Sequence, residues 1–246
     1  MKKIAILVFG KYGDFDTAVK FWDFKDQLDC DFYFSTWDIT SKNNDHAGYN
    51  NDFKRKVTLE MITDYIPNAV VSLQNELEYN GKRYGVYEHD YGPSQEKLIH
   101  HWKECLRLVE ESGKKYNQIM LLRPDMVHRF YFPVEELYQY TKKDRIYNHT
   151  GGITQGEKGN YVNDTFFIGD FEIMSNMIKT FPDIATEKAN HWDTADHILS
   201  CNLFVEHIEG IDPILLRPNV SLLKEEEKTI ENFQKYFKIW LGEIKL

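Results

Sequence analysis

The chain has 246 residues, and its 30 Lys and Arg against 39 Asp and Glu give a formal net charge of −9. An apolar share of 42% is enough for a sizeable core and excludes intrinsically disordered, collagen-like and disulfide-scaffold classes. The acidic balance argues against a general nucleic-acid binder, because neutralising phosphates needs a basic face.

The N-terminal region predicts a buried strand and no leader segment. Ile4 to Phe9 is a short apolar run that meets Gly10 to Asp14 without a small-residue cleavage site. No apolar stretch is long enough to span a bilayer. The three cysteines, Cys30, Cys105 and Cys201, are far apart and show no metal-ligand spacing, which favours a reducing compartment. We therefore expect a soluble, cytoplasmic protein without a transmembrane segment.

In the first half of the chain, continuous apolar runs alternate with segments that have helical periodicity. Continuous apolar runs predict buried strands at 3–9, 31–36, 69–73 and 118–122. Helices are predicted after a capping Asp14, around 59–66, and from Ser94 to a C-cap at Ser112 and Gly113. The segments 41–52 and 79–91 read as irregular. Alternating strands and helices predict a parallel sheet with right-handed crossovers.

The second half of the chain predicts shorter strands and two further helices. A glycine-rich loop is expected at 148–160, followed by short strands at 165–168, 214–216 and 220–223. Helices are expected around 171–181 and 195–203. We predict one α/β domain over residues 1–223, with a mostly parallel central sheet flanked by helices. Residues 224–246 are expected to form an amphipathic C-terminal helix packed on that domain.

In open parallel sheets, ligands bind beyond the carboxyl ends of the strands. Four segments meet that condition: Gly10 to Asp14, Ser35 to Asp38, the residues after Leu73, and Arg123-Pro124-Asp125. In the last, the cation and the carboxylate are two residues apart and share one face of an extended chain. A guanidinium suits bidentate phosphate contacts, and a carboxylate suits a divalent cation that bridges phosphates. The pair predicts either a diphosphate site or an ion pair that ties a loop.

The segment Leu121 to Val127 resembles the Asp-x-Asp region of GT-A-fold glycosyltransferases. It is similar to the Arg-Pro-Asp variant in small glycosyltransferases of large DNA viruses and of bacterial surface-polysaccharide loci. The likeness extends from Lys3 to Leu223 and also includes the Phe9-Gly10 loop, Asp31 to Asp38, the helix from Gln95 through Lys103, Asn163 to Gly169, and Trp192 to Asp196. It implies a GT-A-like, Rossmann-like domain. The implied activity moves a hexose from a nucleotide-diphosphate sugar, with UDP favoured, to a glycan or other hydroxyl acceptor.

The resemblance also suggests roles for particular residues. Those expected to bind the nucleotide sugar are Phe9, Gly10, Lys11, Tyr12, Asp38, Arg123 and Asp125. Arg123 is expected to stabilise the leaving diphosphate. If the reaction inverts configuration, a carboxylate must take the acceptor proton. Asp164 is the first choice for this base, Asp196 the second and Asp193 the third, with helix capping as the alternative role for the last two.

Manganese or magnesium is the cofactor that the resemblance implies, but Arg123 replaces the first Asp of the motif. Asp125 therefore either ligates a metal, with His207 as a second candidate ligand, or Arg123 acts without one. The expected partners are a nucleotide-sugar donor and a glycan acceptor, and no nucleic acid.

Other classes of protein fit less well. Gly10-Lys11-Tyr12-Gly13 lacks the Gly-x-Gly-x-x-Gly pattern of dinucleotide oxidoreductases, and the chain has no P-loop. The loop is too short for a sugar-phosphate nucleotidyltransferase, and a metal hydrolase would show denser His and Asp clusters. A GT-A-like module that binds a glycan or nucleotide without turnover stays open.

Overall fold

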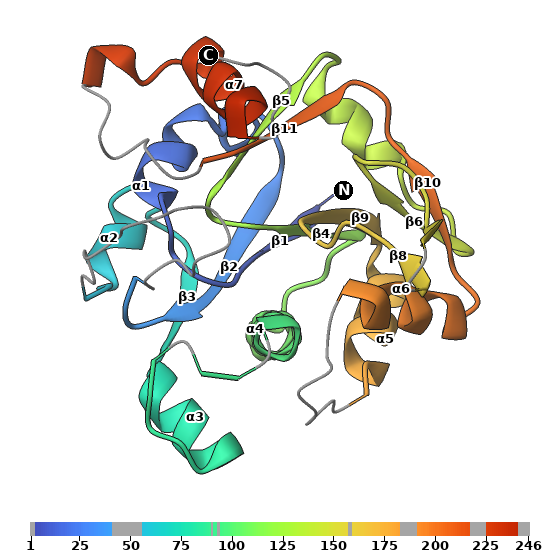
Figure 1. The fold of residues 1–246 in the computed structure, drawn as a ribbon. Helices are drawn as coiled ribbons and strands as arrows, with labels where there is room; N and C mark the ends of the chain where they lie inside the picture. The colour runs from blue at the N-terminus through green and yellow to red at the C-terminus, as the bar shows by residue number, and fades with distance from the viewer. Residues whose placement is uncertain are drawn as a thin grey trace.

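The computed structural model describes residues 3–40, 56–89, 91–92, 94–156, 159–182, 191–216 and 225–240. Its centre is a seven-stranded sheet of order β10-β6-β9-β4-β1-β2-β3 (Figure 1). The strands are β1 Ile4–Phe9, β2 Cys30–Trp37, β3 Val70–Gln74, β4 Gln118–Leu122, β6 Arg145–Asn148, β9 Phe166–Asp170 and β10 Phe204–His207. Only β9 runs antiparallel to its neighbours in this sheet. The predicted mixed α/β fold with a mostly parallel central sheet is confirmed.

Both faces of the sheet are covered, which explains the continuous apolar runs of its central strands. Alternate β1 residues Ile4, Ile6 and Val8 join a core that includes Phe15 and Ile62. These two belong to the short helices α1 Phe15–Ala18 and α2 Glu60–Thr63. The residues between them, Ala5, Leu7 and Phe9, join a second core. That core also includes residues of α4 Ser94–Glu111, α5 Phe171–Thr180 and α6 His191–Ser200.

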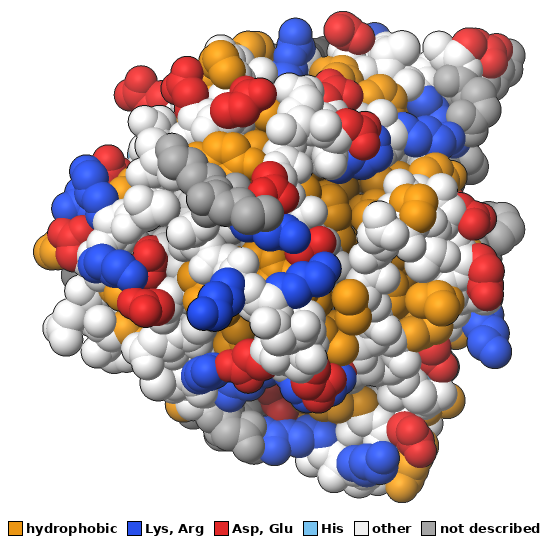
Figure 2. Space-filling model, turned by 180° about the vertical axis from the view of Figure 1, so that it is seen from behind, with side chains coloured by type: hydrophobic (Ala, Val, Ile, Leu, Met, Phe, Trp, Pro, Cys, Tyr) orange, Lys and Arg blue, Asp and Glu red, His pale blue; other side chains and the backbone are white. Residues whose placement is uncertain are grey.

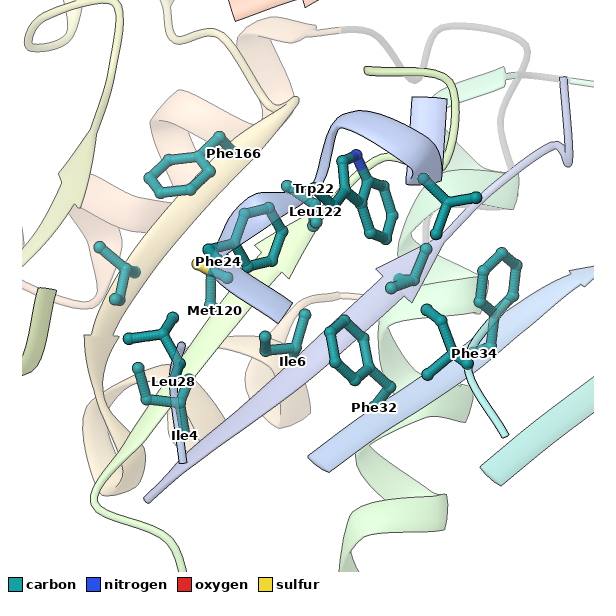
Figure 3. Packing of buried hydrophobic residues seen from close by; sticks show 14 of the residues in the cluster. Ile4, Ile6, Trp22, Phe24, Leu28, Phe32, Phe34, Met120, Leu122 and Phe166 are labelled. Carbon is teal, nitrogen blue, oxygen red and sulfur yellow. The ribbon is translucent and has the colours of Figure 1, made fainter. Parts of the chain in front are cut away.

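Trp22 anchors the first core (Figure 3). Its ring stacks on Phe24 with a centroid separation of 5.7 Å, and it lies nearly parallel to Phe32 at 6.5 Å. Its indole Nε1 donates a hydrogen bond of 2.7 Å to the backbone oxygen of Met126. This bond ties the segment after β1 to the strand that follows Arg123-Pro124-Asp125.

Two small sheets and a closing helix complete the fold. The first pairs β5 Met126–Phe130 with β11 Ile211–Leu215, and the second pairs β7 Thr154–Gly156 with β8 Gly159–Tyr161. The closing helix α7, Ile230–Trp240, buries Phe233 in a cluster with Ile214 and Leu216. The expected boundary between residues 223 and 224 lies outside the described residues.

Some local expectations are corrected. The helix after Asp14 lasts one turn and continues as the 3₁₀ turns η1 Val19–Phe21 and η2 Asp23–Asp26, and the Asp14 side chain makes no capping bond. The segment 79–91, expected to be irregular, begins inside helix α3 Glu76–Tyr84, which Asn75 caps. The glycine-rich loop contains the β7–β8 ribbon.

Five strands were not expected, namely β5, β6, β10 and the two ribbon strands β7 and β8. Two 3₁₀ turns, η4 Val134–Gln139 and η6 Glu225–Glu227, are also present. The expected loop at 41–52 and strand at 220–223 lie outside the described residues. Among the residues that are described, no helix has the length and apolar character needed to cross a membrane.

Candidate functional site

Arg123 and Asp125 meet at the carboxyl end of the central strand β4. The Arg123 Nε donates to Asp125 Oδ1 at 2.9 Å, and an Arg123 terminal nitrogen, Nη2, donates to Oδ2 at 2.7 Å. The two side chains are 23% and 11% exposed, so the pair lies at the protein surface and is shielded on most sides. The structure therefore brings the two residues together as a bidentate ion pair.

The loop after β1 packs against this pair. Gly13 has a positive φ of 53°, and a Cβ added there would lie 2.9 Å from the Asp125 Cβ. Only glycine combines that backbone conformation with so close an approach. The loop therefore limits access to Asp125 from the β1 side.

We expect Gly13→Ala to reduce the stability of the fold. The methyl group meets Asp125, and an alanine at positive φ costs about 1–2 kcal/mol. Overpacking against Asp125 adds about 1 kcal/mol or more. Urea unfolding measures the loss.

Gly113→Ala is the matched control for this prediction. Gly113 also has a positive φ, of 65°, but a Cβ added there would have no neighbour within 4 Å. It follows α4, away from the pair. An equal loss of stability in the two variants would contradict a specific contact between the loop and Asp125.

Asp164 adds a second carboxylate at the same edge of the sheet. It precedes β9, which runs antiparallel to β4, and it is 2% exposed. Burial acts to lower the pKa of Arg123, but the charges of Asp125 and Asp164 outweigh it and raise that pKa above its ordinary value. The guanidinium is therefore charged and lies in the field of two carboxylates.

Asp196 and His207, the second candidate base and the second metal candidate, have hydrogen-bond partners other than Arg123 and Asp125. Asp196 is exposed on α6, where it accepts a hydrogen bond of 2.9 Å from the side chain of Asn160. The side chain of Asp193 lies outside the described residues. His207 is exposed on β10, and its Nε2 is 3.0 Å from the backbone oxygen of His149.

Two aromatic residues expected to bind the nucleotide sugar, Phe9 and Tyr12, are in the core. Phe9 is fully buried, with its ring centroid 5.5 Å from that of Trp102. Tyr12 is also fully buried and donates from its hydroxyl to the backbone oxygen of Met61 at 3.3 Å. Neither side chain is therefore exposed at the surface, where a nucleotide could contact it.

Asp38, Gly10 and Lys11, which were also expected to bind the nucleotide sugar, have different surroundings. The Asp38 carboxylate accepts bonds from the Asn75 side chain at 2.9 Å and from the Glu76 backbone nitrogen at 3.4 Å. It thus ties the end of β2 to the start of α3. Gly10, with φ 101°, donates from its backbone nitrogen to Ser35, and Lys11 beside it is half-buried.

A buried polar group that the sequence did not predict lies beneath this edge. Lys97 on α4 donates to Glu76 at 2.5 Å, and both residues are buried. His101, one turn later, lies 2.8 Å from the Ser35 hydroxyl. Burial, then the charges of His100, Lys97 and Lys11, hold the pKa of His101 well below its usual value. Lys97 and His101 are four residues apart and therefore share one face of the helix. This spacing was the one feature of the sequence that could have indicated the group.

His128 and His149 form a second buried group. Their ring centroids are 5.6 Å apart, and none of their four ring nitrogens has a hydrogen-bond partner among the described residues. Burial, with the charge of His207, lowers the pKa of His149 to about 3. Burial, with the charge of His149, holds the pKa of His128 well below its usual value. Both are therefore neutral in the folded protein.

These two histidines predict a loss of stability in acid. Each binds a proton in the unfolded chain below about pH 6.5 but remains neutral when folded, so the free energy of unfolding falls as the pH drops from about 6.5 toward the folded pKa. For His149, whose folded pKa is about 3, the free energy of unfolding falls by about 2 kcal/mol between pH 6.5 and 5, and His128 acts in the same direction. Urea unfolding of wild type and His149→Gln across this range measures it. An unchanged pH slope in the variant would contradict the assignment.

The charged side chains on one face of the molecule are mixed in sign. Figure 2 shows Lys and Arg side chains interspersed with Asp and Glu, with hydrophobic side chains between them. Within the described ranges, no group of three or more His, Cys, Asp or Glu is arranged to hold a metal ion.

The fold is a mixed α/β arrangement with a mostly parallel central sheet. The sequence matches no protein-family model and no curated protein. Among solved structures, the chain is similar to a nucleotidyl transferase from Methanothermobacter thermautotrophicus, with a TM-score of 0.43 and 9% sequence identity over 99% of each chain. A likeness of this size carries no conclusion about activity.

Proposed function

We propose that the protein is a glycosyltransferase that moves a hexose from a nucleotide-diphosphate sugar to a hydroxyl group of a glycan or other acceptor. UDP-sugars are the favoured donors because of the resemblance of the Arg-Pro-Asp segment. The observation that carries the proposal is the Arg123–Asp125 ion pair at the carboxyl end of the central strand. Ligands of open α/β sheets bind at this edge.

The chemistry follows from where charge develops. The bond between the anomeric carbon and the diphosphate oxygen breaks, and the acceptor oxygen forms the new bond to that carbon. Negative charge accumulates on the leaving diphosphate, where the Arg123 guanidinium stabilises it. In an inverting reaction, the acceptor proton passes to a carboxylate, for which Asp164 is the choice because its charge acts on Arg123.

One observation favours a second candidate, a GT-A-like module that binds a glycan or nucleotide without turnover. Both oxygens of Asp125 are already occupied by Arg123, as in a pair that only stabilises a loop. Arg123 would still be available to a phosphate in such a module, so the two candidates share the site and differ in the reaction.

The experiment that separates them is a measurement of nucleoside diphosphate release. The full chain is incubated with a panel of UDP- and GDP-sugars and hydroxyl acceptors, and released UDP or GDP is quantified. Sugar transfer to an acceptor supports the transferase. Saturable binding of a sugar nucleotide with no release above background supports the module, and absence of both binding and release would contradict the two.

A further inference from the structure

We propose that the site binds a nucleoside diphosphate without a divalent cation, with the Arg123 guanidinium supplying the positive charge that a metal would otherwise carry. This inference rests on the proposed function and specifies the cofactor requirement of the same site. Three features of the described residues carry it: the state of the Asp125 carboxylate, the surrounding donor groups, and the distribution of cations.

The Asp125 carboxylate is not arranged as a metal ligand. Its two oxygens accept from two different Arg123 nitrogens at 2.9 and 2.7 Å. A divalent cation at the same oxygens would have to displace the guanidinium or sit beside it, where like charges repel. Gly13 packs against the Asp125 Cβ and leaves this side chain little room to turn away from Arg123.

The nearby groups do not complete a metal site either. Magnesium and manganese favour several oxygen ligands around one ion. Asp164 is the next carboxylate, and its charge already acts on Arg123. His207 lies on β10, with its Nε2 at the backbone oxygen of His149. Throughout the described part of the chain, no three such side chains converge on a position for an ion.

Cationic side chains are instead placed to meet a diphosphate. A guanidinium has five N–H donors, and the two used on Asp125 leave three with no hydrogen-bond partner among the described residues. The Arg123 side chain is 23% exposed, so solvent reaches it. Lys11, which follows Gly10 after the end of β1, is half-buried and adds a second cation at this edge of the sheet.

The test is a calorimetric titration of UDP, and separately of inorganic pyrophosphate, into the metal-stripped full chain. One series contains excess EDTA, and the other contains manganese chloride. We expect dissociation constants that agree within about threefold, which is well under the factor of ten that corresponds to about 1.4 kcal/mol. Binding that needs manganese, or that is more than about tenfold tighter with it, overturns the inference and leaves the proposed function intact. Absence of UDP and pyrophosphate binding in both series contradicts the diphosphate site, and the inference with it.

The Arg123→Asp variant sharpens the test because it restores two carboxylates two residues apart. We expect UDP affinity in EDTA to fall by about 30-fold or more, as when a charged partner is removed from a buried pair. Manganese is expected to recover part of that affinity in the variant and none in wild type. If the variant binds UDP in EDTA as tightly as wild type, Arg123 is not the required cation and the inference is overturned.

Arg145→Met is the matched control for loss of an arginine. Arg145 begins β6 and pairs with Asp144 and Glu206, so it is a partly exposed arginine with two carboxylate partners. Its replacement is expected to leave UDP affinity in EDTA unchanged. A loss equal to that of Arg123→Asp would show a general charge effect and overturn the assignment to Arg123.

Discussion

Arg123→Met is expected to lower the rate of sugar transfer by about 10²–10³-fold, the loss typical of removing one positioned donor from a developing negative charge. The reason is local: Arg123 lies at the carboxyl end of β4 and has N–H groups beyond the two that bind Asp125. Steady-state rates of nucleoside diphosphate release measure the effect.

Stability must be followed in the same variant, because the change leaves the shielded Asp125 carboxylate without its partner. Arg123→Lys keeps the positive charge but not the bidentate geometry, and we expect it to retain a larger share of the rate. A folded Arg123→Met protein with a wild-type rate would remove Arg123 from the mechanism.

Asp164→Asn is expected to reduce transfer by about 10²–10⁴-fold, the contribution typical of a general base. The amide is nearly the same size as the carboxylate but cannot accept the acceptor proton. Donor affinity is expected to stay close to that of wild type, since the change leaves the Arg123–Asp125 pair in place. Single-turnover rates and UDP titrations on the same preparation separate the two quantities.

Asp196→Asn is the matched control, because Asp196 is exposed and bonded to Asn160. We expect it to keep most of the wild-type rate. If Asp164→Asn instead loses rate and UDP affinity together, Asp164 acts by positioning Arg123. If Asp196→Asn shows the larger loss of rate with normal UDP affinity, Asp196 is the base.

The central strands were predictable because burial on both faces leaves a continuous apolar run. This holds for β1 and β4, all of whose side chains are buried. β10 has only four residues and half-buried or exposed side chains, and β6 carries polar residues at both ends, so neither gives such a run. Helix α3 has a low apolar content, and its signal was the capping Asn75 with the terminal Gly85.

The site could be predicted only as far as neighbours in the chain determine it. The Arg123–Asp125 pair follows from a spacing of two residues at the end of a strand. Phe9 and Tyr12 are buried because other segments pack against the sheet at these positions. The order of residues along the chain does not show which segments those are. The Glu76–Lys97 pair joins the start of α3 to the face of α4, and only the fold brings these together.

A crystal structure with UDP bound tests most directly whether the Arg123–Asp125 pair is a diphosphate site. We predict diphosphate oxygens within hydrogen-bonding distance of the Arg123 guanidinium, with the Asp125 bond retained and no cation between Asp125 and the phosphates. UDP seated elsewhere, with Arg123 in contact with Asp125 alone, would contradict the assignment of this pair to the substrate.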